Sequence, residues 1–250
     1  MLRIVCTLWG DAYGYDIAES LKKRIDIYCT TPYTFHIIDE FDEIFTPFSE
    51  KHYRGTGAPS EPRDLIHNGF HRDDFGGIPH HRKLELFYRD VEFADPDDTI
   101  LYLDLDSRIY GDITDLVSLD LSKPYIVKNY WWDEDPYPWK RQYSINRCPL
   151  YNSSVWMWKT GQNRPIIDFI SENTDKVFST YPSIDNFLWH QFGPYSHPDR
   201  RDHFEFFPEG FVTTQRELKG NPGHIHLFEG IPHAEKLQYL RFHRHPSPNS

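Results

Sequence analysis

Two carboxylates, Asp104 and Asp106, directly follow an apolar run, residues 99–103, that predicts a buried strand. Ligands of open α/β sheets bind outside the carboxyl ends of the strands, so acidic side chains here are well placed to act on one. On a regular strand the two residues would lie roughly 6.6–6.8 Å apart on one face. A turn would let one carboxylate bind a hard cation, Mg²⁺ or Mn²⁺, while the other binds the same ion, a water or a sugar hydroxyl.

A divalent cation at such a position neutralises a diphosphate and makes it a competent leaving group. The alternative is that the acidic pair only ends a strand in water, because two aspartates at this spacing often occur by chance. The apolar strand before the pair, in a chain of alternating strands and helices, favours the chemical interpretation.

The elements that must position these carboxylates begin at the N-terminus. Residues 3–9 are apolar and β-branched and lead into a loop bounded by Gly10 and Gly14, which indicates a strand followed by a turn. Asp16 is the expected cap of a helix over residues 17–24, and residues 35–38 predict the next strand. Strand, helix and strand at this spacing predict a βαβ unit, a parallel sheet and the α/β class.

Further elements follow, separated by irregular stretches at residues 46–81 and 131–147. The pattern predicts helices from Arg82 to Tyr88 and from Pro165 to Val177, and strands over residues 125–127 and 151–158. From Glu229 onward little periodicity remains. We expect one domain over residues 1–240 and a loose tail over residues 241–250.

Composition limits the function classes. The 250 residues carry 27 basic and 38 acidic side chains, a net charge of −11, which argues against general nucleic-acid binding. We read no signal peptide and no stretch long enough to span a bilayer, and three scattered cysteines suit a reducing cytoplasm. Aromatic residues make up 16%, and we expect most of them in the core.

The segment Tyr102-Leu103-Asp104-Leu105-Asp106, followed by Ile109-Tyr110-Gly111-Asp112-Ile113, resembles the D-x-D region of GT-A-fold glycosyltransferases that use nucleotide sugars, nearest to the glycogenin and bacterial galactosyltransferase type. Other segments resemble that family in the same order, over about residues 1–235. They are residues 8–14, 35–39, 82–87, 151–158, 183–188, 206–210 and 226–230. The resemblance implies a single Rossmann-like domain with a mostly parallel central sheet and helices on both faces.

The resemblance also implies roles for individual residues. Asp106 would bind Mn²⁺ or Mg²⁺ directly, Asp104 would bind the metal or the ribose, and the third ligand would be His226, His224 or a non-protein oxygen. Asp185 would be the catalytic carboxylate. Contacts with a UDP-sugar would come from Thr7, Leu8, Tyr13, Asp39, Lys83, Asp104 and Leu105.

Each of these roles has a structural alternative. Tyr13 or Trp9 would stack on the uracil, although Trp9 equally suits packing under the sheet, and Asp39 suits capping a turn. Lys83, or Arg82 in its place, would contact the diphosphate, although a helix lysine is commonly solvated. Asp185 could instead cap a helix that begins near Asn186. Three further sets of residues could either bind a ligand or have a purely structural or exposed position. They are Asp112, the pair His80 and His81, and the aromatic group Trp131, Trp132, Tyr137 and Trp139.

The predicted function is transfer of a hexose from a UDP-sugar, UDP-glucose or UDP-galactose, to a saccharide hydroxyl, with metal dependence. Asp185 would deprotonate the acceptor in an inverting transfer, or stabilise the donor sugar in a retaining one. The alternative is a non-catalytic carbohydrate-binding protein that uses the Trp-rich loop. A different metal-dependent phosphate enzyme is disfavoured, since the chain has no G-x-x-x-x-G-K-[ST] loop and no dense array of carboxylates and histidines.

Overall fold

The structure is a computed structural model. It describes residues 1–8, 13–39, 83–129, 149–181, 183–193, 203–214, 223–228 and 232–241. The helices are α1 (Tyr15–Tyr28), α4 (Glu85–Phe93), α5 (Arg164–Thr180), α6 (Ile184–Phe192) and α7 (His233–Arg241), with a 3₁₀ helix, η3 (Thr114–Ser118). The strands are β1 (Leu2–Leu8), β2 (Tyr33–Asp39), β3 (Thr99–Leu103), β4 (Ser107–Ile109), β5 (Tyr125–Lys128), β6 (Tyr151–Lys159), β7 (Glu205–Phe206), β8 (Val212–Thr214) and β9 (Ile225–Leu227).

A central mixed sheet has the strand order β2-β1-β3-β6-β5-β7. β1 pairs in parallel with both β2 and β3, and β5 pairs in parallel with β7, whereas β6 is antiparallel to both of its neighbours. β6 therefore runs against the other five strands. The predicted α/β class and mostly parallel sheet are confirmed.

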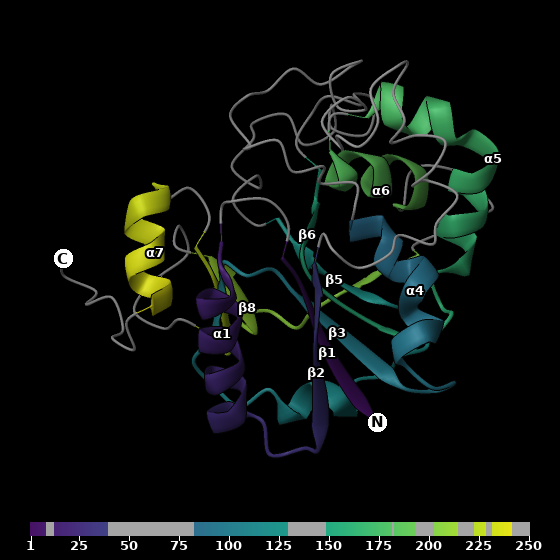
Figure 1. The fold of residues 1–250 in the computed structure, drawn as a ribbon. Coiled ribbons are helices and arrows are strands. Elements are labelled where there is room, and N and C mark those ends of the chain that lie inside the picture. Colours follow the sequence, from purple (N-terminus) through teal and green to yellow (C-terminus); the bar gives the residue numbers. More distant parts are fainter. Residues whose placement is uncertain are drawn as a thin grey trace.

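Helices cover both faces of this sheet, as predicted (Figure 1). Alternate residues of a strand point to opposite faces, and β3 shows the pattern clearly. Leu101 and Leu103 pack in the cluster that contains the apolar residues of α1, while Ile100 and Tyr102 pack in the cluster that contains those of α4, α5 and α6. Because both faces are buried, the sequence of β3 is a continuous apolar run without polar alternation.

Many of the aromatic residues form the core on the α4 side. The side chains of Trp156 and Trp158 on β6 are at most 1% exposed. The ring of Phe87 on α4 stacks on Trp156 at 4.8 Å and meets Trp158 edge-on at 5.3 Å. Among the described residues, core packing thus accounts for much of the aromatic surplus, as expected.

A smaller sheet, in the order β4-β9-β8, lies beyond the carboxyl end of β3. β9 pairs antiparallel with β4 and parallel with β8. The chain passes from the central sheet to this one between Leu103 and Ser107, which is where the two predicted metal-binding aspartates stand. The short strands β4, β8 and β9 were not predicted, because three residues are too few for a recognisable pattern.

Three local predictions differ from the structure. Gly14, not Asp16, is the N-cap of α1, and Asp16 lies in the first turn. α4 starts at Glu85 and runs to Phe93, later and further than expected. Residues 233–241 form the helix α7, where an irregular end was predicted, because α7 has a single buried residue, Leu240, and therefore shows no apolar stripe.

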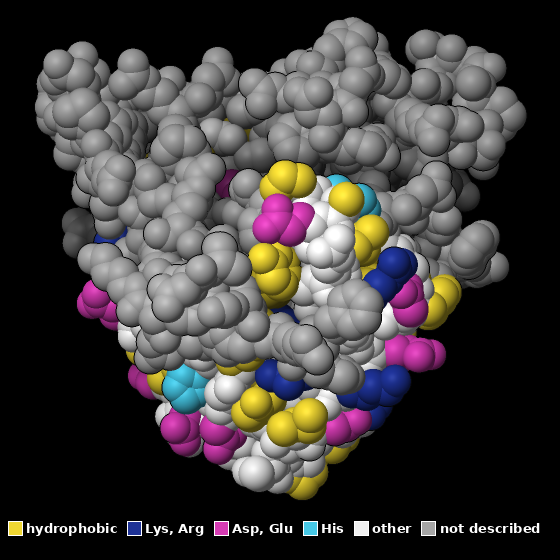
Figure 2. All heavy atoms as spheres, turned by 90° about the vertical axis from the view of Figure 1, so that its left-hand side faces the viewer, with side chains coloured by type: hydrophobic (Ala, Val, Ile, Leu, Met, Phe, Trp, Pro, Cys, Tyr) yellow, Lys and Arg dark blue, Asp and Glu magenta, His cyan; other side chains and the backbone are white. Residues whose placement is uncertain are grey.

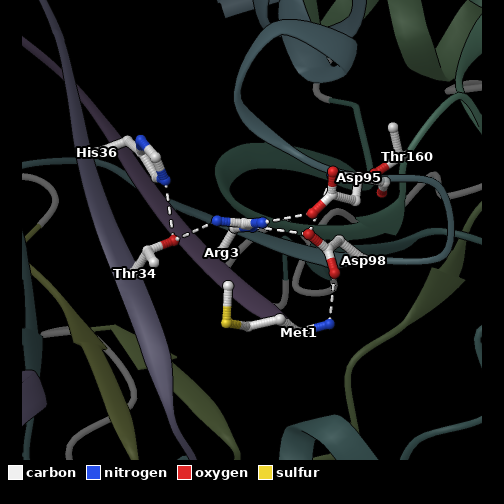
Figure 3. Close-up of polar contacts among 7 residues, drawn as sticks. All are labelled: Met1, Arg3, Thr34, His36, Asp95, Asp98 and Thr160. Carbon is white, nitrogen blue, oxygen red and sulfur yellow. Dashed lines mark hydrogen bonds and ion pairs between the residues drawn. The ribbon is translucent and has the colours of Figure 1, made fainter.

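At the amino ends of β1, β2 and β3 a polar network holds the strands together (Figure 3). Asp98, which precedes β3, accepts from the N-terminal ammonium of Met1 and, at 2.7 Å, from Arg3 Nε. Arg3 also reaches Asp95 at 3.0 Å and Thr34 on β2 at 3.3 Å. The network lies at the edge of the sheet opposite Asp104 and Asp106.

The described surface on the side of α1 and α7 carries acidic, basic and apolar side chains interspersed with one another (Figure 2). α7 lies beside α1 (Figure 1). Within the part of the chain that the structure describes, no helix has both the length and the apolar character needed to cross a membrane.

Candidate active site

Asp104 and Asp106 lie in a tight turn between β3 and β4. Ser107 N donates to Asp104 O at 3.0 Å and closes the turn. Two more backbone hydrogen bonds fix the turn on both sides. Asp104 N donates to Ser154 O at 2.8 Å, and Phe228 N donates to Asp106 O at 3.1 Å. Both aspartate side chains are 19% exposed. The expected turn at the end of this strand is therefore present, and both carboxylates remain accessible from the surface.

Lys83 binds Asp104. Its Nζ lies 2.6 Å from Asp104 Oδ2 and 3.3 Å from the carbonyl oxygen of Ser153, with only 12% of the lysine side chain exposed. The ammonium also lies 5.6 Å from the centre of the Tyr102 ring. The alternative of a solvated helix lysine is wrong, because Lys83 precedes α4 and its charge is buried against the carboxylate of Asp104. Sequence reasoning did not predict this ion pair.

The second oxygen of Asp104 accepts a hydrogen bond from the Tyr102 hydroxyl, which in turn lies 3.0 Å from Thr7 Oγ1 on β1. Burial raises the pKa of Asp104, Lys83 opposes this shift, and the nearby charge of Asp106 adds to it. Burial and the same carboxylate hold the pKa of Tyr102 well above its usual value. Thr7 is thus brought to the site through Tyr102.

Asp106 has a different cation, Lys236 on α7, whose Nζ lies 2.7 Å from Asp106 Oδ2. Sequence reasoning missed Lys236. The pair joins residues 130 positions apart, and the weakly patterned segment around Lys236 gave no signal for a helix at this place. The two aspartates are therefore matched by two lysines from distant parts of the chain.

Tyr13 lies near both carboxylates. Burial raises its pKa most, and the charges of Asp106 and then Asp104 raise it further. Its ring centre lies 5.3 Å from that of His233 at the start of α7. An aromatic ring is therefore available beside the acidic turn, as the uracil-stacking prediction requires.

Leu8 and Leu105 are buried in the core, 7% and 4% exposed, so a nucleotide would meet their backbone more readily than their side chains. Asp39 is the last residue of β2 and pairs with Leu8 across the β1–β2 ladder. Several predicted candidates lie outside the described residues: Trp9, His80, His81, Arg82, Trp131, Trp132, Tyr137 and Trp139.

Asp185 joins the same region through the backbone of Ser153 on β6. Ser153 N donates to Asp185 Oδ1 at 2.9 Å, while the carbonyl oxygen of Ser153 accepts from Lys83. Burial raises the pKa of Asp185, its hydrogen bonds to Ser153 and the charge of Lys83 oppose this, and Asp104 adds to it. The alternative that Asp185 caps the helix is wrong, because Ser183 is the N-cap of α6 and accepts from Asn186 N at 3.2 Å.

The predicted third metal ligands lie in the small sheet and beside it. His226 on β9 is fully buried, with Nδ1 3.1 Å from Thr213 Oγ1 and its ring edge-on to Phe228. His224 stacks on Phe211 at 4.3 Å and its Nδ1 contacts the carbonyl oxygen of Asp112. Across the described ranges, no three His, Cys, Asp or Glu side chains form a group ready to hold a metal ion. Asp104 and Asp106 are thus placed together, and the described residues do not supply an assembled third ligand.

Asp112 fits its structural alternative. Its carboxylate accepts from Thr114 N at 2.7 Å, at the start of η3. Hydrogen bonding to Thr114, first through its side chain and then through its backbone amide, lowers the pKa of Asp112. An aspartate that binds the backbone amide two residues on stabilises a turn.

Comparison with known proteins gives a consistent result for the fold. No protein-family model matches the chain, and no curated protein matches it in sequence. Solved structures do match. The galactosyltransferase LgtC, in complex with donor and acceptor sugar analogues, has a TM-score of 0.58 at 16% identity, covering 91% of this chain and 87% of that one. A glycosyltransferase involved in glycosylation of the major capsid of PBCV-1 has a TM-score of 0.57 at 13% identity, covering 96% and 98%. This chain therefore has the GT-A fold of these glycosyltransferases, as the D-x-D resemblance implied.

Proposed function

We propose that the protein is a metal-dependent glycosyltransferase that moves a hexose from a UDP-sugar, UDP-glucose or UDP-galactose, to a saccharide hydroxyl. The observation that supports this best is the acidic turn at the carboxyl end of β3. Asp104 and Asp106 stand there with Lys83 and Lys236 on their oxygens. Carboxylates and ammonium groups gathered at one place suit a ligand that carries both a cation and a diphosphate.

The two carboxylates fit a hard divalent cation, since they are oxygen donors in a fixed turn and already attract positive charge. Asp106 and Asp104 would hold Mn²⁺ or Mg²⁺, with His226, His224 or a donor oxygen as the third ligand. When bound, the ion would neutralise charge on the departing diphosphate. Lys83, held against Ser153 O and Asp104, would add a fixed positive charge at the same group.

The remaining residues would bind and orient the donor. Tyr13 offers an apolar ring face beside the acidic turn for a uracil, and Asp39, at the end of the neighbouring strand β2, would hydrogen-bond the base or ribose. Asp185, tied to Ser153 N, would face the sugar or the acceptor hydroxyl. It would take the acceptor proton in an inverting transfer, or stabilise positive charge on the sugar in a retaining one.

A donor screen tests this proposal. Released UDP is measured across sugar and base variants, with Mn²⁺ and with EDTA. We expect turnover of at least one UDP-hexose with the metal and little with EDTA. We also expect Asp106→Asn to reduce kcat/KM by at least about 10²-fold, because the carboxylate acts on the charge of the leaving group.

The matched control is Asp26→Asn, which removes an exposed carboxylate from the Lys22–Asp26 pair on α1, where both side chains are nearly half exposed. It should leave turnover unchanged. Equal UDP release with EDTA, or full activity of Asp106→Asn, would contradict the metal role. Saccharide binding without any UDP binding in calorimetry would favour a carbohydrate-binding protein instead.

The free thiols of Cys6 and Cys29 agree with the reducing cytoplasm that we propose as the compartment. Burial raises the pKa of the Cys6 thiol to about 12, so it stays protonated and unreactive at neutral pH.

A further inference from the structure

We propose that Lys236 is a built-in counter-ion of the acidic turn, which a divalent cation must displace from Asp106 before the site can bind its donor. The inference rests on the proposed function and extends it by one residue that the sequence did not identify. Lys236 Nζ lies 2.7 Å from Asp106 Oδ2, and the two side chains are 14% and 19% exposed. At this distance and burial the pair is only partly screened by water.

The charges at the turn balance without a metal ion. Asp104 and Asp106 carry two negative charges, and Lys83 and Lys236 supply two positive ones. A cation that binds between the carboxylates meets an ammonium group on Oδ2 of each of them. Since like charges repel at short range, at least one ammonium must leave for the cation to enter.

Lys236 is the better candidate to leave, because fewer contacts with described residues hold it. Lys83 also contacts the carbonyl oxygen of Ser153 and lies over the Tyr102 ring. For Lys236 Nζ the described contact is the Asp106 carboxylate. Lys236 also lies in the first half of a short helix with one buried residue, so its side chain can turn away without disturbing a core.

The helix itself stays attached when Lys236 lets go, because its other end is fastened separately. Arg108 Nη1 donates to the carbonyl oxygen of Leu240 at 2.8 Å, and Ser20 Oγ donates to the same oxygen at 2.7 Å. Arg241 Nε pairs with Asp16 Oδ2 on α1 at 2.8 Å. A guanidinium at the last carbonyl groups of a helix is a favourable position for positive charge. The displaced ammonium therefore remains near the site.

If Lys236 competes with the metal ion, its removal should increase the affinity for Mn²⁺. Removing the positive charge with Lys236→Met should make Mn²⁺ bind the nucleotide-free protein more tightly, by roughly 3- to 10-fold, because the ion no longer competes with an ammonium. Binding is measured by calorimetry, or by the paramagnetic resonance signal of free Mn²⁺. Lys236→Arg keeps the charge and should show no such gain.

Thermal unfolding provides a second measurement, independent of the Mn²⁺ binding experiment. Without Mn²⁺, Lys236→Met leaves Asp106 without its ammonium and should unfold at a lower temperature than the wild type. Mn²⁺ should then raise its Tm more than it raises that of the wild type, because the tighter-bound ligand stabilises the native state more. Lys22→Met, which removes the ammonium of the exposed Lys22–Asp26 pair, is the matched control and should change neither Mn²⁺ affinity nor the Mn²⁺-dependent shift in Tm.

The outcomes separate the two proposals. If the wild type binds UDP with Mn²⁺ but Lys236→Met binds Mn²⁺ equally or more weakly, the counter-ion role is wrong and the proposed function stands. If the wild type and Lys236→Met bind neither Mn²⁺ nor UDP, both are wrong. Tighter Mn²⁺ binding in Lys236→Met, absent in Lys236→Arg and Lys22→Met, supports the inference.

Discussion

At the scale of single residues, Asp185 has a carboxylate whose ionisation opposes folding. Its pKa is raised in the native state, chiefly by burial. A carboxyl group with a raised native pKa contributes stability below its unfolded value, about 3.9, and that contribution is lost as pH rises through the native value. At neutral pH its charge therefore costs stability, as is common where a group is kept for chemistry.

Asp185→Asn should accordingly separate activity from stability. The amide oxygen of asparagine can still accept the hydrogen bond from Ser153 N, and no charge has to be buried. We expect kcat for UDP-sugar turnover to fall by about 10²- to 10⁴-fold, while the free energy of unfolding at pH 7, from urea titration, stays equal or rises.

The control for this variant is Asp168→Asn on α5, whose carboxylate is 57% exposed and pairs with Arg164. It should leave activity unchanged and stability within about 0.5 kcal/mol. A fully active Asp185→Asn enzyme would show that Asp185 has no part in the reaction. A loss of activity that only follows a loss of stability would assign it a structural role.

At the scale of elements, the position of Lys83 depends on how α4 is held, because the helix begins at Glu85, two residues further on. Asp90 on α4 is 1% exposed. Its Oδ2 accepts from the Trp158 indole at 3.2 Å and from Gly161 N at 2.8 Å, which joins α4 to the end of β6. β6 also supplies the Ser153 carbonyl oxygen that Lys83 contacts.

Asp90→Ala should lower the free energy of unfolding by roughly 1–3 kcal/mol, because it leaves the buried indole N–H of Trp158 and the partly buried backbone N–H of Gly161 without their acceptor. Asp90→Asn keeps an acceptor oxygen and, since burial raises the pKa of Asp90, removes a charge that is costly to bury. It should lose less stability than the alanine variant. Urea unfolding at pH 7 measures both, and equal stability of all three proteins would contradict the role of this link.

Elements buried on both faces were the ones that sequence reasoning located best. The bounds of β3 were predicted correctly because a fully buried strand is an uninterrupted apolar run. α7 was missed because its only buried residue is Leu240, so its position depends on tertiary contacts from Arg108 and Ser20. The site divides in the same way. The acidic turn follows from a local pattern, whereas Lys236 is defined by a contact that only folding creates.

At the scale of the whole molecule, the two edges of the central sheet have different tasks. The carboxyl ends of the strands carry the candidate active site, and the amino ends carry the network around Asp98 (Figure 3). The Met1 ammonium and, to a smaller extent, Arg3 hold the pKa of Asp98 well below its usual range, although burial acts in the opposite direction. This stability is present above about pH 3.9 and is lost as pH falls further, toward the native value.

A second group makes the fold sensitive to acid in a higher range. Burial, with a smaller effect of Lys123, lowers the pKa of His203 to about 4. Its Nε2 lies 2.9 Å from Asn163 Oδ1, and its ring lies edge-on to Phe192 and Phe204. The native state therefore holds His203 neutral where the unfolded chain, with a pKa of about 6.5, takes up a proton.

Stability from His203 is complete above about pH 6.5 and is lost progressively as pH falls toward 4, on the order of 3 kcal/mol in all. His203→Gln keeps a donor for Asn163 Oδ1 but cannot titrate, so its unfolding free energy should decline less over this range. Urea titrations at pH 7, 5.5 and 4.5 measure the unfolding free energy of both proteins. The contributions of the other histidines largely cancel in the difference between the two. Parallel stability curves would show that protons reach His203 in the native state as readily as in the unfolded chain. Convergence of the curves as pH falls would show that burial of His203 between α6 and β7 makes the fold lose stability in acid, independently of the distant carboxylate turn.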